Sequence, residues 1–265
     1  MAFIEAIGGA ATDIREGFRA TPLWWRLGID STVARYRRTI LGPFWMASST
    51  IATGFALSIV FGTIFGGDWR HNFPFILAGV LSFNLASGLI ADGAQVFMNS
   101  SGIMQVRNFP LSFYSLLMCD KAVINFVHQL VAFLVITFLF RVGAIPNWTI
   151  VLTLPLVVLI GLFASFPLGM ISTRYRDVSY FIMLILQSMF MLTPVFWPRS
   201  QMPAHFRWIV TYNPFAYMVE VLRQPLIGHP AAVSDIVACC MFLAVAVLLA
   251  IVCLALFRRR VTFWL

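Results

Sequence analysis

The sequence predicts an all-α integral membrane protein with six transmembrane helices. Of the 265 residues, 60% are hydrophobic and only 11% are charged, whereas soluble domains carry about 25% charged residues. Six separate segments each contain roughly 20 mostly apolar residues, the length that a helix needs to cross the hydrocarbon core of a bilayer. This composition excludes a water-soluble enzyme, a disordered chain and a nucleic-acid-binding domain.

Short polar or charged turns separate the apolar segments. The third segment carries Asp120, Lys121 and His128 near its start, and the fourth contains two prolines, which neighbouring helices in a bundle tolerate. The expected spans are residues 44–66, 73–91, 116–140, 149–172, 179–197 and 233–257.

Basic residues predict the orientation of these spans. Six spans place both termini on one side of the membrane, and thirteen of the eighteen basic residues lie on that side. Because cytoplasmic loops are enriched in Lys and Arg, we expect both termini in the cytoplasm. Residues 1–43 are then a cytoplasmic N-terminal interfacial segment, and residues 44–265 form the six-span domain.

The N-terminal segment shows a helical pattern of apolar residues. Phe3, Ile7, Ile14 and Phe18 fall near one face of a helix and are interspersed with charged residues. Such a pattern is typical of a helix that lies along the membrane interface.

Two further regions outside the spans have ordered patterns. The cytoplasmic loop 92–115 predicts a short helix at 93–99, a second at 103–107 and an elbow at Phe109-Pro110. On the outer side, segments 202–212 and 215–226 are separated by Asn213-Pro214. Apolar helices of that length are re-entrant or interfacial rather than spanning, so we expect a lid or vestibule before the last span.

Motifs for catalysis and metal binding are absent from the sequence. The only lysine, Lys121, follows no glycine-rich loop, so the chain lacks the phosphate-binding loop of an ATPase. We expect no catalytic residue, no metal site and no cofactor bound by this chain. Asp120, Lys121 and His128 permit two interpretations: a proton relay, or an ion pair near the interface beside a histidine that faces the bundle.

Gly161, Ser165 and Gly169 are spaced for close helix contact, either inside the chain or between two copies.

The most specific stretch is RYRRTILGPFW at residues 35–45. It resembles the RYRR(S/T)xLGxxW signature of ABC-2-type permeases that export polysaccharides, although Pro43 departs from some relatives. Four further stretches resemble the same family in the expected order: GIMQVRNFPLS at 102–112, RYRD at 174–177, MLTPVFWP at 191–198 and YNPFAY at 212–217.

The resemblance implies a homodimeric permease that works with two copies of an ATP-binding ABC subunit, which holds ATP and Mg. It also implies that the complex moves a polyprenyl-pyrophosphate-linked glycan across the bacterial inner membrane. The expected partners include membrane lipids and exclude nucleic acid. Capsule exporters in this family commonly lack the full RYRR form, which favours O-antigen over capsule as the substrate, and teichoic acid remains an alternative.

The positions that match the family motifs carry side chains whose chemistry indicates their roles. Arginine guanidinium groups bind phosphates bidentately, so Arg35, Arg37 and Arg38 are expected to bind the lipid pyrophosphate. An unspecific topology cluster is the alternative. Aromatic rings pack against apolar sugar faces, although an interfacial aromatic belt explains the same residues. The candidate glycan channel comprises Phe44, Trp45, Phe190, Phe196, Trp197 and Tyr212.

The cytoplasmic loop between the second and third spans is the expected contact with the ATPase. The contact residues that we expect are Gln95, Met98, Ile103, Arg107 and Asn108.

Three other classes of protein remain as alternatives. A drug- or lipid-exporting ABC-2 permease shares the fold and differs in the width and wetness of its pore. A polyprenyl-phosphate sugar transferase needs clustered acids at one membrane face, whereas Asp92, Asp120 and Asp177 are scattered. A secondary transporter is disfavoured because the centres of the spans carry no acid.

Overall fold

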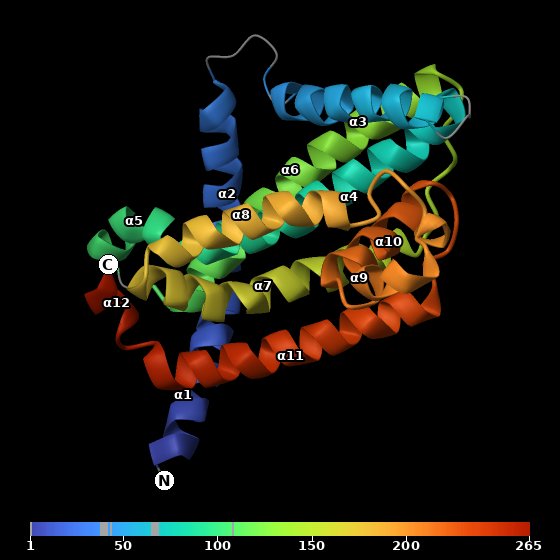
Figure 1. The fold of residues 1–265 in the computed structure, drawn as a ribbon. Coiled ribbons are helices and arrows are strands. Elements are labelled where there is room, and N and C mark those ends of the chain that lie inside the picture. The colour runs from blue at the N-terminus through green and yellow to red at the C-terminus, as the bar shows by residue number, and fades with distance from the viewer. Residues whose placement is uncertain (1, 38–41, 43, 65–68, 108) are drawn as a thin grey trace.

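The computed structural model describes residues 2–37, 42, 44–64, 69–107 and 109–265, and all regular elements in these ranges are helices (Figure 1). Five of the helices are long and apolar enough to cross a membrane, and one further apolar helix is shorter. The five are α3 (Phe44–Ile64), α4 (Trp69–Asn99), α6 (Leu111–Leu139), α7 (Ile150–Arg174) and α11 (Val233–Phe257), and the shorter one is α8 (Asp177–Leu192). The all-helical class is confirmed, with five rather than six helices of spanning length.

Two N-terminal helices run across the long helices instead of along them. In Figure 1, α1 (Ala2–Arg19) and α2 (Thr21–Tyr36) lie roughly at right angles to α4, α7 and α11. The short helices α5 (Ser101–Val106) and α12 (Val261–Trp264) lie at the same end of the bundle. Helix α1 packs against α6 and α11, and α2 packs against α6.

Asp13 fixes α1 to the start of α6. Its carboxylate is 9% exposed and accepts hydrogen bonds from the backbone N–H groups of Leu111 at 3.0 Å and Ser112 at 2.9 Å. The Ser112 hydroxyl donates to the backbone oxygen of Asp13. The first N–H groups of a helix have no partner inside the helix, so α1 supplies the cap that α6 lacks in its own sequence.

The loop between the second and third expected spans is shorter than the sequence predicts. The expected separate helix at 93–99 is wrong, because α4 continues unbroken to Asn99 and only α5 is a separate helix. Helix α6 begins at Leu111, directly after Pro110, whose extended backbone ends the loop. No residue before Asn99 forces a break, since Gly93 is tolerated inside a helix, and a Cβ atom on Gly93 would lie only 3.1 Å from that of Ser165 on α7.

Small residues bring α4 and α7 into close contact. A Cβ atom on Gly161 would lie 2.6 Å from Leu89, and one on Gly169 would lie 2.9 Å from Val96. The small-residue pattern of α7 therefore serves packing inside the chain, and the alternative of a seam between copies is not needed to explain it.

The outer segment before the last span is irregular at first and then helical. Helix α8 ends at Leu192, where Thr193 is extended before Pro194. The expected helix at 202–212 is wrong: that stretch contains η2 (Ala204–Phe206) and α9 (Arg207–Thr211) after η1 (Arg199–Gln201). The second expected outer helix is present as α10 (Pro214–Leu226).

A buried arginine fastens α10 to the segment after α8. Arg223 is 1% exposed, donates to the carbonyl oxygens of Pro194 at 2.7 Å and Val195 at 3.2 Å, and forms an ion pair with Glu220. Its guanidinium carbon lies 3.9 Å from the centre of the Phe75 ring on α4. Burial lowers the pKa of Arg223, and the Glu220 carboxylate opposes that shift.

Candidate functional site

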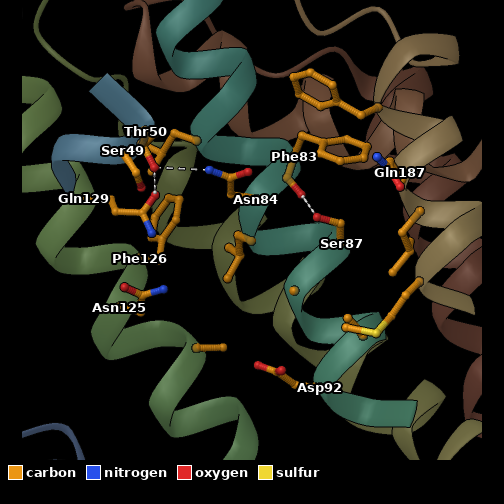
Figure 2. A pocket seen from close by; sticks show the side chains of 18 residues that line it. Ser49, Thr50, Phe83, Asn84, Ser87, Asp92, Asn125, Phe126, Gln129 and Gln187 are labelled. Carbon is orange, nitrogen blue, oxygen red and sulfur yellow. Dashed lines mark hydrogen bonds between the residues drawn. The ribbon is translucent and has the colours of Figure 1, made fainter. Parts of the chain in front are cut away.

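A cavity of about 570 Å³, which we call the central cavity, lies among α3, α4, α6 and α8 (Figure 2). The labelled side chains come from all four helices, and Asp92 is the one acidic residue among those that line it. Its remaining polar lining is uncharged: Ser49, Thr50, Asn84, Ser87, Asn125, Gln129 and Gln187. The lining also includes the rings of Phe83, Phe126 and Phe190.

Three of the polar side chains form a hydrogen-bonded set that joins three helices. The Thr50 hydroxyl donates to the side-chain oxygen of Gln129 at 2.9 Å, and the Asn84 amide donates to the Thr50 hydroxyl at 3.2 Å (Figure 2). Buried polar groups are costly unless they are hydrogen-bonded. The set therefore positions amide groups on the wall of the cavity while limiting their energetic cost.

A row of aromatic rings leads from the central cavity to a second cavity. The ring centres of Phe83 and Phe190 are 5.2 Å apart, those of Phe190 and Phe196 are 6.0 Å apart, and Phe196 stacks on Phe61 at 4.3 Å. Phe61 and Phe196 line a cavity of about 760 Å³ beside the start of α4, which we call the outer cavity. The two cavities are thus connected by packed rings from α3, α4, α8 and the segment after α8.

The expected channel aromatics do not all lie together. Phe190 and Phe196 belong to the aromatic row, whereas Trp197 is half-buried and lines neither cavity. Trp45 is 58% exposed and Tyr212 is 82% exposed, and neither lines these cavities. The side chain of Phe44 lies outside the described part of the structure.

Of the three arginines expected to bind the lipid pyrophosphate, the structure describes one side chain, that of Arg37. Arg37 lines a mainly apolar cavity of about 570 Å³ between α2 and α6, together with Thr32 and His128. We call it the interfacial cavity. Arg38 lies outside the described residues, as does the side chain of Arg35. Apolar walls beside a guanidinium and an imidazole can hold a lipid chain and its anionic head.

Two of the three ionisable residues expected near the start of the third span, Asp120 and His128, have different surroundings. Asp120 is buried against α2, where a Cβ atom on Gly28 would lie 1.7 Å from its carboxylate oxygen. His128 lines the interfacial cavity, and its Nδ1 lies 2.7 Å from the backbone oxygen of Ile124.

The expected ATPase contacts are spread over α4 and α5. Gln95 and Met98 lie on the last turns of α4, Ile103 lies on α5, and Arg107 ends α5. Asn108 lies outside the described residues. Helix α5 has no buried residue, and Val106 is 81% exposed. Ile103, Val106 and Arg107 line a groove of about 530 Å³ between α2 and α5.

Sequence reasoning missed the residues that make the central cavity polar. Thr50, Asn84 and Gln129 are uncharged, and the search for ionisable residues inside spans passed over them. The available signal was an amide in the middle of an apolar helix, because such a group needs a partner or water at that depth. The sequence offers His128 as a proton carrier, whereas its position in the same cavity lining as Arg37 depends on how α2 packs on α6.

Comparison with known proteins identifies the family. Residues 23–227 match the ABC-2 type transporter family, so the chain belongs to that family and is a membrane permease. Two curated O-antigen export system permease proteins (RfbA) of Klebsiella pneumoniae are similar, at 23% and 24% identity, each over 72% of this chain and 74% of the relative. Nodulation protein J of Rhizobium leguminosarum bv. viciae is 33% identical over 43% of this chain and 45% of its own.

Membership of the family confirms the resemblance read from the sequence and the prediction of a permease without ATPase chemistry of its own. It also implies an ATPase partner. Two of the relatives are named for O-antigen export and the third is not, so membership of the family does not define the substrate.

Proposed function

We propose that the chain is the transmembrane subunit of an ABC exporter that moves lipid-linked polysaccharide, with O-antigen as the favoured substrate, across the bacterial inner membrane. Two copies form a homodimer with two ATPase subunits that hold ATP and Mg, and both termini lie in the cytoplasm. Residues 179–197 complete a sixth span: α8 supplies its helical part, and residues 193–197 continue it as buried or half-buried non-helical chain, which is tolerated at membrane depth where protein covers it.

The central cavity is the observation that carries this proposal. Its wall of hydroxyl and amide groups offers hydrogen bonds to sugar hydroxyls, and its rings offer faces to apolar sugar surfaces. Uncharged donors and acceptors exchange partners with water at small net cost, so they suit a chain that must slide. A small apolar substrate would be served better by a cavity without these polar groups.

The interfacial cavity supports recruitment of the lipid end. Arg37 and His128 line an apolar space beside α6, whose neighbouring face carries Asn125 and Gln129 of the central cavity. A polyprenyl pyrophosphate has one long apolar part and one compact anion, which this lining matches. Arg35 and Arg38 flank Arg37 in sequence and complete the cationic cluster in the proposal.

Helix α5 is the proposed site of ATPase coupling. Helix α5 is exposed, and Pro110 connects the segment after it to α6. Asp13 of α1 caps the start of α6. A push on α5 is therefore passed to a helix end that α1 holds in place. Gln95, Met98, Ile103, Arg107 and Asn108 are the proposed contacts.

The test is ATP hydrolysis by the purified complex of this chain and its ATPase in proteoliposomes. We expect vanadate-sensitive hydrolysis that a lipid-linked glycan stimulates, and at least tenfold weaker stimulation after Arg37→Gln. The matched control is Arg19→Gln, which removes the same charge from an exposed position on α1 and should leave stimulation unchanged.

Three results contradict the proposal. Stimulation by small amphiphiles and not by the glycan identifies a drug or lipid exporter. Glycosyl transfer by the chain purified alone identifies a transferase. Full export by an Arg37→Glu variant with inverted topology shows that the cluster serves orientation only.

A further inference from the structure

The outer cavity has a lining unlike that of the central cavity. Three basic side chains line it, each from a different segment: His71 from the first turn of α4, Arg141 from the turn after α6, and His229 from the turn after α10. The side chains of Asn72 and Gln201 add polar groups. No acidic side chain of the described ranges lines this cavity.

Arg141 occupies a backbone conformation that favours glycine. Its φ angle is 56°, and it is the one non-glycine residue with positive φ in the described chain. The N–H groups of Val142 and Gly143 both donate to the backbone oxygen of Thr137 at 3.0 Å, which ends α6 as helices with a left-handed residue commonly end. Such strain persists where the surrounding structure enforces it and clusters at ligand sites.

The segments that carry the basic residues are fastened to one another. The N–H of Asn147 donates to the oxygen of Pro225 at 2.8 Å, which joins the segment after Arg141 to the end of α10. Gly228 has φ of 90°, and a Cβ atom there would lie 2.9 Å from that of Ala144. The Phe140 ring packs edge-on against Phe73 at 5.9 Å, which ties the end of α6 to the first turns of α4.

The two acidic residues that the structure describes near this end of the bundle form ion pairs with other arginines. Glu220 forms an ion pair with the buried Arg223, and Asp235 forms an ion pair with Arg199 at 2.8 Å. Neither carboxylate lines the outer cavity. Among the residues that the structure describes, no carboxylate therefore pairs with the basic side chains of this cavity.

We propose that the outer cavity binds a phosphoryl group. The guanidinium of Arg141 donates several N–H groups in a fork, and each imidazole donates at least one N–H whatever its charge. Donors from three directions suit a tetrahedral anion with several oxygens. The aromatic row ends at this cavity, through Phe61 and Phe196, so apolar surface lies beside the phosphoryl site.

Two sources offer this chemistry on the outer side. One is the pyrophosphate of the lipid-linked substrate as it leaves the transport path, and this source rests on the proposed function. The other is the phosphodiester of a membrane phospholipid, and this source does not depend on the proposed function. In both cases the site holds an anionic lipid head at the outer end of the bundle.

The test is binding of radiolabelled farnesyl pyrophosphate to the purified complex of this chain and its ATPase partner. The parent carries Arg37→Gln, so that the interfacial cavity does not contribute. We expect Arg141→Gly to weaken binding at least tenfold while the unfolding temperature stays equal or rises, because glycine removes the charge and relieves the strained φ. We expect Arg141→Lys to bind more tightly than Arg141→Gly, because it restores a positive charge.

Two controls separate this site from general charge effects. Arg207→Gln removes a charge from an exposed position on α9, outside the cavity, and should leave binding unchanged. Farnesol, which lacks the phosphates, should fail to displace the label. Displacement by phosphatidylglycerol identifies a phospholipid as the source, and displacement by inorganic pyrophosphate with no effect of phosphatidylglycerol identifies the lipid carrier.

The inference is overturned if Arg141→Gly and a His71→Gln/His229→Gln variant both bind farnesyl pyrophosphate as the parent does. Its failure is distinguishable from that of the proposed function. If lipid-linked glycan does not stimulate ATP hydrolysis and Arg141→Gly still loses binding, the polysaccharide proposal fails and the outer phosphoryl site stands.

Discussion

The central and outer cavities are similar in size, at about 570 and 760 Å³, and differ in chemistry. The central cavity is lined by hydroxyl, amide and aromatic groups on helices, with Asp92 as its one acid. The outer cavity is lined by an arginine and two histidines on turns and a helix start. One cavity is therefore suited to the passage of a neutral chain, and the other is suited to holding an anion.

The two cavities also differ in how their walls are supported. Helices α3, α4 and α6 carry the central wall and are joined there by the hydrogen bonds of Thr50. The outer wall combines α3 and the start of α4 with turns and non-helical segments. Arg223 and Arg199 hold the nearby segments through backbone oxygens of Pro194, Val195 and Ala216. The outer cavity is consequently more sensitive to the loss of a single side chain.

The largest effect is expected from Arg223→Ala. Removing the guanidinium leaves two buried carbonyl oxygens without their donor and leaves Glu220 with the Gln224 amide but no cation, and breaking a buried ion pair costs about 3–5 kcal/mol. Thermal unfolding in detergent measures the loss. Arg207→Ala on the exposed face of α9 is the control, and an equal effect of the two substitutions contradicts the assigned role of Arg223.

An intermediate effect is expected when the central cavity is given the chemistry of the outer one. Gln187→Arg places a cation in the central wall, where it should hold the phosphoryl end of the substrate and slow its passage about tenfold, which corresponds to ~1.4 kcal/mol. Export into proteoliposomes measures the rate. Gln187→Met keeps the size without the charge, and if it slows export as much, the charge contrast between the cavities is irrelevant to transport.

The smallest effect is expected from a change that touches neither cavity. Asp13→Ala removes the acceptor for the N–H groups of Leu111 and Ser112, and loss of a helix cap costs about 1 kcal/mol. Unfolding temperature should fall slightly, and coupling of ATP hydrolysis to glycan should weaken. Glu16→Ala, at an exposed position on α1, is the control. If both variants have the same unfolding temperature and the same coupling, Asp13 does not link α1 to α6.

The sequence predicts the helices well where apolar residues are continuous and poorly where tertiary contacts decide the ends. The start of α6 lies at Leu111 because Asp13, 98 residues away in the chain, supplies its cap. The end of α8 lies at Leu192 because Thr193 precedes a proline and its hydroxyl accepts from Asn213. Neither long-range contact is visible in local periodicity.

The site is predictable in part for the same reason. Phe190 and Phe196 were expected in the channel and do lie in the aromatic row, whereas Tyr212 resembles them in composition and is 82% exposed. Aromatic content alone does not show which way a ring points. Arg37 and His128 line one cavity, and Arg141, His71 and His229 line another, because elements from distant parts of the chain pack together.

We propose that the central cavity is the path of the glycan. The most direct measurement is export of lipid-linked glycan into proteoliposomes by an Asn84→Leu/Gln129→Leu complex, with its unstimulated ATP hydrolysis measured in parallel. Because both amides leave the wall together, no unpaired amide remains between them and the helices keep apolar contact. We predict at least a tenfold loss of export with unstimulated hydrolysis unchanged. Export at the unsubstituted rate would contradict the account.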